Sequence, residues 1–241
     1  MRAVVCGANG AMGKLICAAL GDAVIGKVSI DGENGVPKTF EELGPVDANV
    51  LIDFSHHTAV GSVLAYAKKI GCAAVIGTTG HTPEEKAMIF AAAEEIPVFY
   101  AGNVSLGIAV LCRLVKEAVK FFPEADIEIV EIHHTRKVDA PSGTAHMLFN
   151  AVKEVRADAV ENCGRSGEGK RTKDEIGVHA LRGGTVTGEH EVCFFGTSER
   201  VKISHSAENR SVFAAGALRA AEFLVGQKPG MYTMDDVVGK L

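Results

Sequence analysis

The feature that most constrains the fold of this chain is a repeat of short apolar segments, each followed by a turn and then by a segment with helical spacing. The expected strands are residues 2–6, 24–30, 48–54, 73–76 and 97–100. Residues 48–54 (ANVLIDF) are almost continuously apolar, which is typical of a strand covered on both faces. Repeated strand–helix units of this kind predict an α/β fold with a parallel, doubly wound, Rossmann-type sheet.

The first unit carries a glycine motif. Residues 7–13 read GANGAMG, with glycines at the first, fourth and seventh positions, between the expected strand and a helix at about 12–20. Such glycines let the turn tighten and let a pyrophosphate approach the backbone, and the helix N-terminus supplies the positive end of its dipole. In this context the motif predicts a dinucleotide site.

Two further turns of the same half fit such a site. Asp31 lies eighteen residues beyond Gly13, near the spacing of an acid that binds the adenosine ribose. An acid there favours NAD over NADP, because it would repel a 2′-phosphate; a solvated turn acid before Gly32 is the alternative. The segment 77–80 (GTTG) would offer hydroxyl groups at the carboxyl edge of the sheet, where open α/β sheets bind ligands.

The richest polar segment is 131–145, EIHHTRKVDAPSGTA, between an expected strand at 127–130 and a helix at 145–155. If the strand continues through His133 and His134, their side chains point to opposite faces. Lys137 follows three residues later, close enough to reach the same ligand. Ser142 is a natural N-cap, which would aim the backbone N–H groups of Gly143 and Thr144 at an anion. Together these groups predict a small acidic substrate that accepts or gives a proton.

The rest of the chain suggests a second domain. A long helix is expected at 107–122, a glycine-rich, charged loop at 162–174, and strands with period-two stretches between 176 and 206. Antiparallel or mixed pairing would follow, and the outer face of such a sheet often meets a partner subunit, so we expect an oligomer. A helix at about 212–225 would return to the first domain, and 235–238 is a short final piece.

Composition excludes several classes. The net charge of −5 does not support nucleic-acid binding. The six cysteines show no CxxC spacing, which favours reduced, buried thiols in a cytoplasmic protein over disulfides or zinc. His56-His57 and His133-His134 lack the usual spacing of a metal site, so we expect no metal. We also expect neither a secretory signal nor a membrane span.

In their order, the segments GANGAMG, IDFS, GTTG, AGNVSLG, EIHHTRKVDAPSGTA and IGVHALRGGTVTGEHEV resemble the 4-hydroxy-tetrahydrodipicolinate reductase family, also called dihydrodipicolinate reductase. The resemblance implies an NAD(P)H-dependent oxidoreductase that reduces 4-hydroxy-tetrahydrodipicolinate, through a cyclic imine, to tetrahydrodipicolinate in diaminopimelate and lysine biosynthesis. It also implies a dinucleotide-binding domain at 1–104 and 211–241, a substrate-binding and oligomerisation domain with a mixed sheet at 105–210, and a homotetramer formed through those sheets.

The resemblance assigns roles to individual residues. It makes His133 the catalytic histidine and Lys137 the proton donor. The substrate carboxylates would be held by His134, Lys137, Ser142, Gly143 and Thr144. The cofactor, NADH or NADPH, would be bound by Gly7, Ala8, Asn9, Gly10, Ala11, Met12, Asp31, Gly77, Thr78, Thr79, Ala101, Gly102, Asn103 and Val104. The chain departs from the family where His56 replaces an arginine of some members and Val104 replaces a more common phenylalanine.

Two other functions are compatible with these patterns. A non-catalytic dinucleotide sensor would bind NAD(H) without turnover. A dehydrogenase of another small acid, similar to aspartate dehydrogenase, would accept an amino or keto acid and ignore the cyclic imine. Inhibition by a planar pyridine dicarboxylate would separate these alternatives from the reductase.

Overall fold

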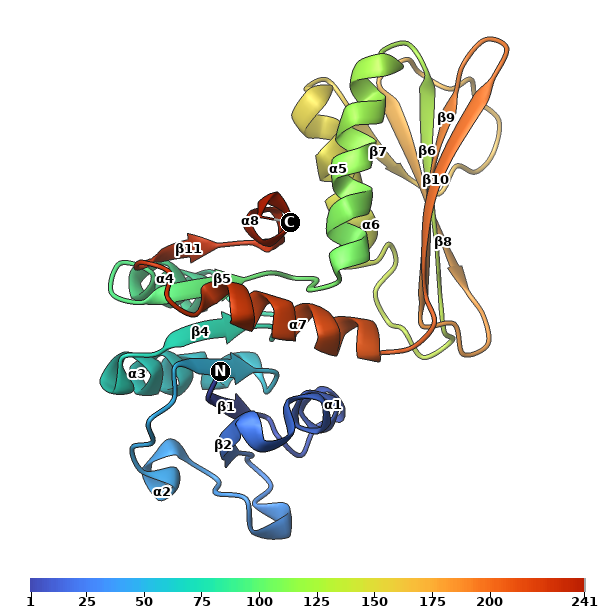
Figure 1. The fold of residues 1–241 in the computed structure, drawn as a ribbon. Helices are drawn as coiled ribbons and strands as arrows, with labels where there is room; N and C mark the ends of the chain where they lie inside the picture. The colour runs from blue at the N-terminus through green and yellow to red at the C-terminus, as the bar shows by residue number, and fades with distance from the viewer. Residues whose placement is uncertain (241) are drawn as a thin grey trace. The chain divides into compact units, whose positions relative to one another are not determined.

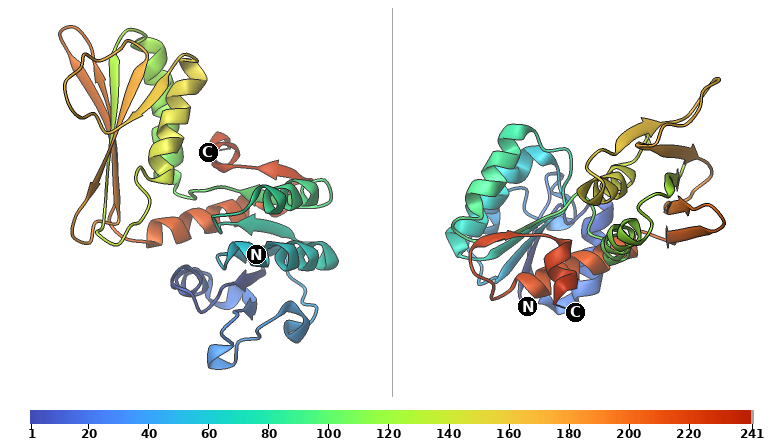
Figure 2. Two further views of the ribbon diagram at one scale, coloured as in Figure 1. Left: turned by 180° about the vertical axis from the view of Figure 1, so that it is seen from behind. Right: turned by 90° about the horizontal axis from the view of Figure 1, so that it is seen from above.

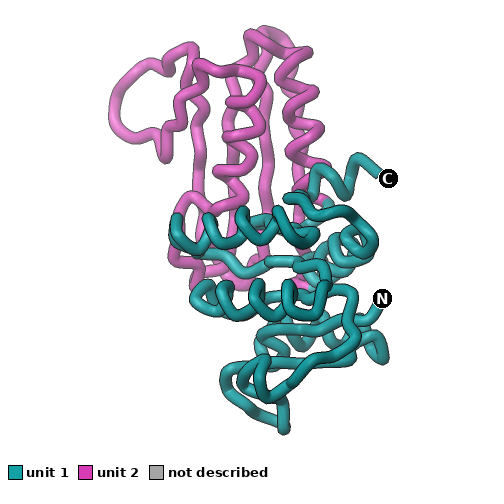
Figure 3. Tube along the Cα trace, turned by 90° about the vertical axis from the view of Figure 1, so that its left-hand side faces the viewer, with its two compact units in different colours: residues 1–106, 211–241 teal, residues 107–210 magenta. Residues whose placement is uncertain are grey.

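The computed structural model describes residues 1–240, and the chain forms two compact units (Figure 3). The first unit comprises Met1–Leu106 and Ser211–Leu241, and the second comprises Gly107–Arg210. The first unit is therefore built from both ends of the chain.

The first unit contains a six-stranded sheet in the order β11-β5-β4-β3-β1-β2, and every neighbouring pair of strands is parallel. The strands are β1 (Ala3–Cys6), β2 (Val24–Val28), β3 (Val50–Asp53), β4 (Ala73–Ile76), β5 (Pro97–Tyr100) and β11 (Gly230–Tyr232). The residues of β3 and β4 are all buried, as expected for strands covered on both faces. The parallel, Rossmann-type sheet predicted from the sequence is confirmed.

Helices cover both faces of this sheet (Figure 2). Their bounds are α1 (Ala11–Leu20), α2 (Phe40–Leu43), α3 (Val60–Ile70), α4 (Pro83–Ala92), α7 (Ser211–Leu224) and α8 (Met234–Gly239). Helices α1 and α7 contact each other on one face, and α3 and α4 contact each other on the other. Apolar side chains of β1, β3, β4 and α3 form the core between these layers. This arrangement places the loops after the strands at one open edge.

The second unit contains a five-stranded mixed sheet in the order β10-β9-β6-β8-β7. Its strands are β6 (Asp126–His133), β7 (Val160–Cys163), β8 (Glu175–Arg182), β9 (Gly188–Phe195) and β10 (Arg200–Ala207). Helices α5 (Leu106–Phe121) and α6 (Gly143–Val155) lie on one face of the sheet (Figure 1). Their apolar residues share a core with β6, β8 and β9.

The burial of β6 alternates along the strand, and Ile127, Ile129, Glu131 and His133 are the buried residues. Since strand side chains alternate between faces, these four residues share the face that packs on the helices. His133, the catalytic residue predicted at the end of β6, thus continues the row of Ile127 and Ile129.

Some boundaries differ from those expected. Strand β2 ends at Val28, so Asp31 lies in the turn beyond it, and β6 ends at His133. The segment after β3 begins as the 3₁₀ turn His57–Ala59 and becomes α3 at Val60. Strands β7 and β11 were not predicted, because both are short edge strands with little period-two patterning. Among the helices of residues 1–240, none is long and apolar enough to cross a membrane.

Candidate functional site

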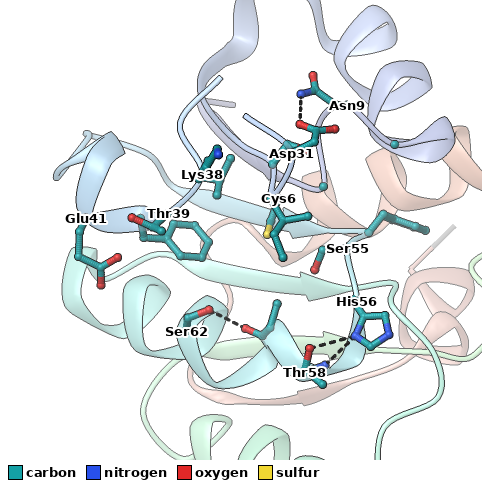
Figure 4. A pocket seen from close by; sticks show the side chains of 18 residues that line it. Cys6, Asn9, Asp31, Lys38, Thr39, Glu41, Ser55, His56, Thr58 and Ser62 are labelled. Atoms are coloured by element: carbon teal, nitrogen blue, oxygen red, sulfur yellow. Dashed lines mark hydrogen bonds between the residues drawn. The ribbon is translucent and has the colours of Figure 1, made fainter. Parts of the chain in front are cut away.

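The first candidate site lies at the topological switch point of the parallel sheet. Strand β1 pairs with β2 on one side and with β3 on the other, so the strand order reverses at β1. Open α/β sheets bind ligands at such a point, outside the carboxyl ends of the strands. A cavity of about 520 Å³ lies there, lined by the turns after β1, β2 and β3 (Figure 4). Gly7, Asn9, Gly10 and Asp31 line it, as does His56.

The glycine motif is required by close packing. Gly7 has φ +77°, a left-handed conformation, and a Cβ on it would collide with the backbone of Phe54. Gly13 lies in α1 directly against the carbonyl of Gly7, so a Cβ there would also meet backbone. Gly10 is the N-cap of α1. These contacts bring the N-terminus of α1 to the cavity, where its dipole favours an anion such as a pyrophosphate.

Asp31 stands at the edge of the same cavity. Its Oδ1 accepts a hydrogen bond from the Asn9 side chain at 2.5 Å (Figure 4). It accepts a second from the Glu33 N–H at 3.1 Å. Asn9 also donates to the Glu33 carbonyl at 3.1 Å. The hydrogen bond from Asn9, followed by that from Glu33, lowers the pKa of Asp31 below its usual value. The acid is therefore ionised and oriented, as a ligand for ribose hydroxyl groups must be.

A buried carboxylate that sequence reasoning missed ties two of these turns together. Asp53, at the end of β3, is fully buried and accepts hydrogen bonds from the Ser55 hydroxyl at 2.5 Å and the Thr78 hydroxyl at 2.6 Å. The Ser55 N–H in turn donates to Thr78 Oγ1 at 2.9 Å. Burial raises the pKa of Asp53, and the hydroxyl hydrogen bonds oppose that shift. The Thr78 hydroxyl thus holds the turn after β4; an acid at the end of a continuously apolar strand was the available signal.

The remaining predicted cofactor residues occupy the same edge of the sheet but do not line the cavity. Ala8 is buried, and Ala11 and Met12 begin α1. Gly77, Thr78 and Thr79 follow β4, and Ala101, Gly102, Asn103 and Val104 follow β5. The ladder aligns the strand ends, with Asp53 opposite Ile76 and Ile76 opposite Tyr100. The sheet therefore brings all the predicted segments to one edge, but only the turns nearest the switch point line the cavity.

The second candidate site lies in the second unit, at the end of β6. His133 is the last residue of the strand, is 8% exposed, and places Nδ1 2.6 Å from Oε2 of Glu131. Burial lowers the pKa of His133, and the Glu131 carboxylate acts in the opposite direction. Arg182 of β8 donates to both oxygens of Glu131, at 2.8 and 2.7 Å. Sequence reasoning missed Glu131 and Arg182, although an acid at an inward position of a strand was visible.

The loop after β6 carries the predicted lysine. The Lys137 ammonium lies 2.9 Å from Oδ1 of Asp139, and its backbone N–H donates to the His134 carbonyl at 3.1 Å. His134 leaves the strand, its N–H donating to the Val186 carbonyl at 2.8 Å. Its ring Nδ1 is buried and has no hydrogen-bond partner within residues 1–240. The hydrogen bond from the Lys137 N–H to the His134 carbonyl therefore closes a tight turn that carries both side chains.

The loop ends at the capped start of α6. Ser142 is the N-cap, and its hydroxyl accepts a hydrogen bond from the Ala145 N–H at 3.2 Å. Gly143 is the first residue of the helix and is exposed, with Thr144 following it. A helix start presents its first backbone N–H groups and the positive end of its dipole. The start of α6, with Ser142, Gly143 and Thr144, is therefore suited to a carboxylate.

His190 of β9 packs behind His133, with ring centroids 5.2 Å apart and the planes at 75°. It is 4% exposed, and burial lowers its pKa to about 4. Its Nε2 lies 3.4 Å from the Ser142 hydroxyl. His190 is therefore a neutral imidazole that supports both the histidine and the cap, a role that sequence reasoning did not assign.

All six cysteines are free thiols, and Cys6, Cys72, Cys112 and Cys193 are buried. Within residues 1–240 no group of three or more His, Cys, Asp or Glu residues is placed to hold a metal ion.

Comparison with known proteins identifies the family. A family model described as dihydrodipicolinate reductase, N-terminus, matches residues 1–104, and one described as dihydrodipicolinate reductase, C-terminus, matches residues 107–238. The chain is 46% identical to the 4-hydroxy-tetrahydrodipicolinate reductase of Caldanaerobacter subterraneus subsp. tengcongensis, over 100% of this chain and 99% of that one. It is 40% identical to the protein of that name from Clostridium novyi, over 98% of each chain.

Solved structures agree on the fold. Dipicolinate-bound dihydrodipicolinate reductase from Paenisporosarcina sp. TG-14 aligns with a TM-score of 0.75 at 22% identity, over 97% of each chain. Aspartate dehydrogenase from Thermotoga maritima aligns with a TM-score of 0.51 at 16% identity, over 95% of this chain and 98% of that one. The family models together span both units, and the full-length relatives carry the same family name. The chain therefore belongs to the dihydrodipicolinate reductase family.

Proposed function

We propose that this protein is an NAD(P)H-dependent oxidoreductase that reduces 4-hydroxy-tetrahydrodipicolinate, by way of a cyclic imine, to tetrahydrodipicolinate in diaminopimelate and lysine biosynthesis. The observation that carries the proposal is the single segment from His133 to Thr144, which joins an imidazole, a lysine and a capped helix start in a chain of this family. The sensor and the aspartate dehydrogenase-like alternatives are not favoured, because the full-length relatives at 40–46% identity are named as reductases of this substrate.

The cavity of the first unit fits a dinucleotide. Gly7 and Gly10 let a pyrophosphate approach the N-terminus of α1, and Asp31 is ionised beside the expected ribose position. A bound reduced nicotinamide would supply the hydride. Asp31 favours NADH over NADPH; Lys38, which also lines the cavity, would face a 2′-phosphate and moderate that preference. We therefore expect the enzyme to use both cofactors and to prefer NADH.

The segment of the second unit fits a small dicarboxylate. Lys137, His134 and the start of α6 at Gly143 and Thr144 would hold its carboxylates, the lysine exchanging Asp139 for the ligand. As negative charge builds on the reduced ring, Lys137 donates a proton and neutralises that charge. His133 tunes or relays the proton from its place at the end of β6.

The second unit also offers a surface for self-association. On the face of the mixed sheet turned away from α5 and α6, β6 presents Val130 and Ile132, and β8 presents Leu181, which is 47% exposed. Apolar side chains on an uncovered sheet face mark an interaction site. We propose a homotetramer assembled through these sheets. Light scattering should give the mass of a tetramer for the wild-type protein and a smaller mass for Val130→Glu. A wild-type monomer would contradict the proposal.

The reductase activity is tested by following the absorbance of NADH and of NADPH with freshly prepared cyclic imine, and by inhibition with pyridine-2,6-dicarboxylate. We expect rapid oxidation that the planar dicarboxylate blocks. Cofactor binding without oxidation would instead indicate the sensor. Oxidation driven only by an amino or keto acid would indicate the dehydrogenase of another small acid.

A further inference from the structure

Glu131 is a buried carboxylate of the second unit with polar partners at both of its oxygens. Its side chain is fully buried in β6, on the face covered by the helices. Oε1 accepts hydrogen bonds from the Ser142 N–H at 2.9 Å and from the Arg182 guanidinium at 2.7 Å. Oε2 lies 2.8 Å from Arg182 and 2.6 Å from Nδ1 of His133. One carboxylate therefore joins the end of β6, the end of β8 and the start of α6.

The chemistry of these neighbours determines the state of both side chains. Arg182 and the Ser142 N–H can only donate, so Glu131 must accept from them. Burial raises the pKa of Glu131, but the hydrogen bonds from Arg182 and His133 outweigh it, and the pKa is lowered overall. An ionised carboxylate has only acceptor sites, so the His133 Nδ1 facing it must carry a proton. Neutral His133 consequently has its lone pair on Nε2.

The other side of the His133 ring is kept open by a glycine. Gly188 of β9 lies beneath Nε2, and a Cβ at that position would stand 3.1 Å from this nitrogen. Arg182 Nη2 also donates to the Asp139 carbonyl at 2.6 Å, which connects the same cluster to the loop that carries Lys137. The His133 imidazole and the start of α6 are thus hydrogen-bonded to Glu131. The loop that carries Lys137 is connected to Glu131 through Arg182.

We propose that Glu131 is a positioning residue of the reductase: it holds His133 as the Nδ1-protonated tautomer, with Nε2 as the proton-exchanging atom, and fixes the start of α6 relative to that atom. The proposal rests on the proposed function for its kinetic consequences. Its structural content, the tautomer of His133, does not depend on activity.

Glu131→Gln is the informative substitution. A carboxamide has one acceptor oxygen and one donor nitrogen. With its nitrogen at the Oε2 position it would oppose an Arg182 donor and the His133 Nδ1–H; at the Oε1 position it would oppose the Ser142 N–H. The variant must therefore lose either the tautomer or the anchor of α6. Glu128→Gln is the matched control, because Glu128 lies on the same strand, outside the proposed site, and pairs with His179 at 2.7 Å and Arg171 at 3.1 Å.

The first measurement is NMR of the wild-type protein with ¹⁵N-labelled histidine, assigned with His133→Asn. A protonated Nδ1 and an unprotonated Nε2 in neutral His133 is the expected result. A neutral His133 protonated on Nε2 would overturn the proposal, even if no variant of Glu131 folds.

The second measurement compares kcat, KM and pH profiles of wild type, Glu131→Gln and Glu128→Gln, with binding of pyridine-2,6-dicarboxylate. We expect Glu131→Gln to lower kcat by about 10-fold or more. The profile limb that reports His133 should move to lower pH, because the carboxylate raises the pKa of the imidazole. An active Glu131→Gln with the wild-type limb would refute the positioning role, whereas an inactive wild type would refute the proposed function instead.

Discussion

The ammonium of Lys137 lies 2.9 Å from Oδ1 of Asp139, two residues further along the same loop, and the lysine side chain is 21% exposed. The charge is therefore paired but reachable from solvent. A dicarboxylate that enters the segment would exchange one carboxylate partner for another, which is a smaller electrostatic change than ordering an unpaired lysine. This relationship makes Lys137 the first residue to test.

Lys137→Met keeps the length and apolar stem of the side chain but removes the proton and the charge. We expect kcat to fall by about 10²–10⁴-fold, the usual contribution of a general acid, in NADH oxidation assays. Lys120→Met in α5, where the lysine pairs with Glu117 on the surface, should retain wild-type kcat. An unchanged kcat in Lys137→Met would show that another group donates the proton.

Stability should depend on pH through His190. Burial lowers its folded-state pKa to about 4, below the unfolded value of 6.5, so the unfolded chain binds this proton first. The contribution of neutral His190 to the free energy of unfolding is complete above pH 6.5. It is lost as the pH falls towards 4, and the total loss is about 3 kcal/mol. Urea unfolding followed by circular dichroism should show a shallower decline in His190→Gln over this range. His146→Gln, on the exposed side of α6, is the control; equal slopes in wild type and His190→Gln would contradict the prediction.

Cofactor choice should respond to Asp31. In Asp31→Ser the oriented carboxylate is lost, and we expect KM for NADH to rise by about 10-fold because a charged hydrogen bond to the ribose is removed. KM for NADPH should fall, since the repulsion of a 2′-phosphate disappears while Lys38 remains in the cavity. Asp22→Ser, an exposed acid of the turn Gly21–Ala23, should leave both values unchanged. A parallel rise in both KM values would mean that Asp31 only supports the turn.

Two helical glycines should behave in opposite ways. Gly13 packs on the backbone of Gly7 and Ala8, so Gly13→Ala should destabilise the protein by about 1–3 kcal/mol and weaken NADH binding. Gly61 is exposed in α3, where a Cβ would have only the Met88 sulfur nearby at 3.9 Å. Gly61→Ala should therefore stabilise the protein by about 0.5–1 kcal/mol. Thermal unfolding and NADH titration measure both, and a neutral Gly13→Ala would refute the close approach.

The sequence alone determined the features that depend on neighbouring residues. Period-two and helical spacing located most of the strands and helices, and the glycines of residues 7–13 predicted the turn after β1. The loop from His133 to Thr144 was visible for the same reason, because its groups are close in the chain. The family resemblance, which the family models confirm, rested on those local motifs.

The tertiary structure alone decided which distant polar groups are buried together. Glu131 and Arg182 are 51 residues apart, Asp53 and Thr78 are 25 apart, and Ser142 and His190 are 48 apart. Strand register within each sheet sets the first two pairs, and the packing of α6 on the mixed sheet sets the third. Register and packing depend on long-range pairing that leaves no periodic trace in either segment. Buried polar groups must find partners, so the fold, and not the local pattern, assigns Arg182 to Glu131 and Thr78 to Asp53.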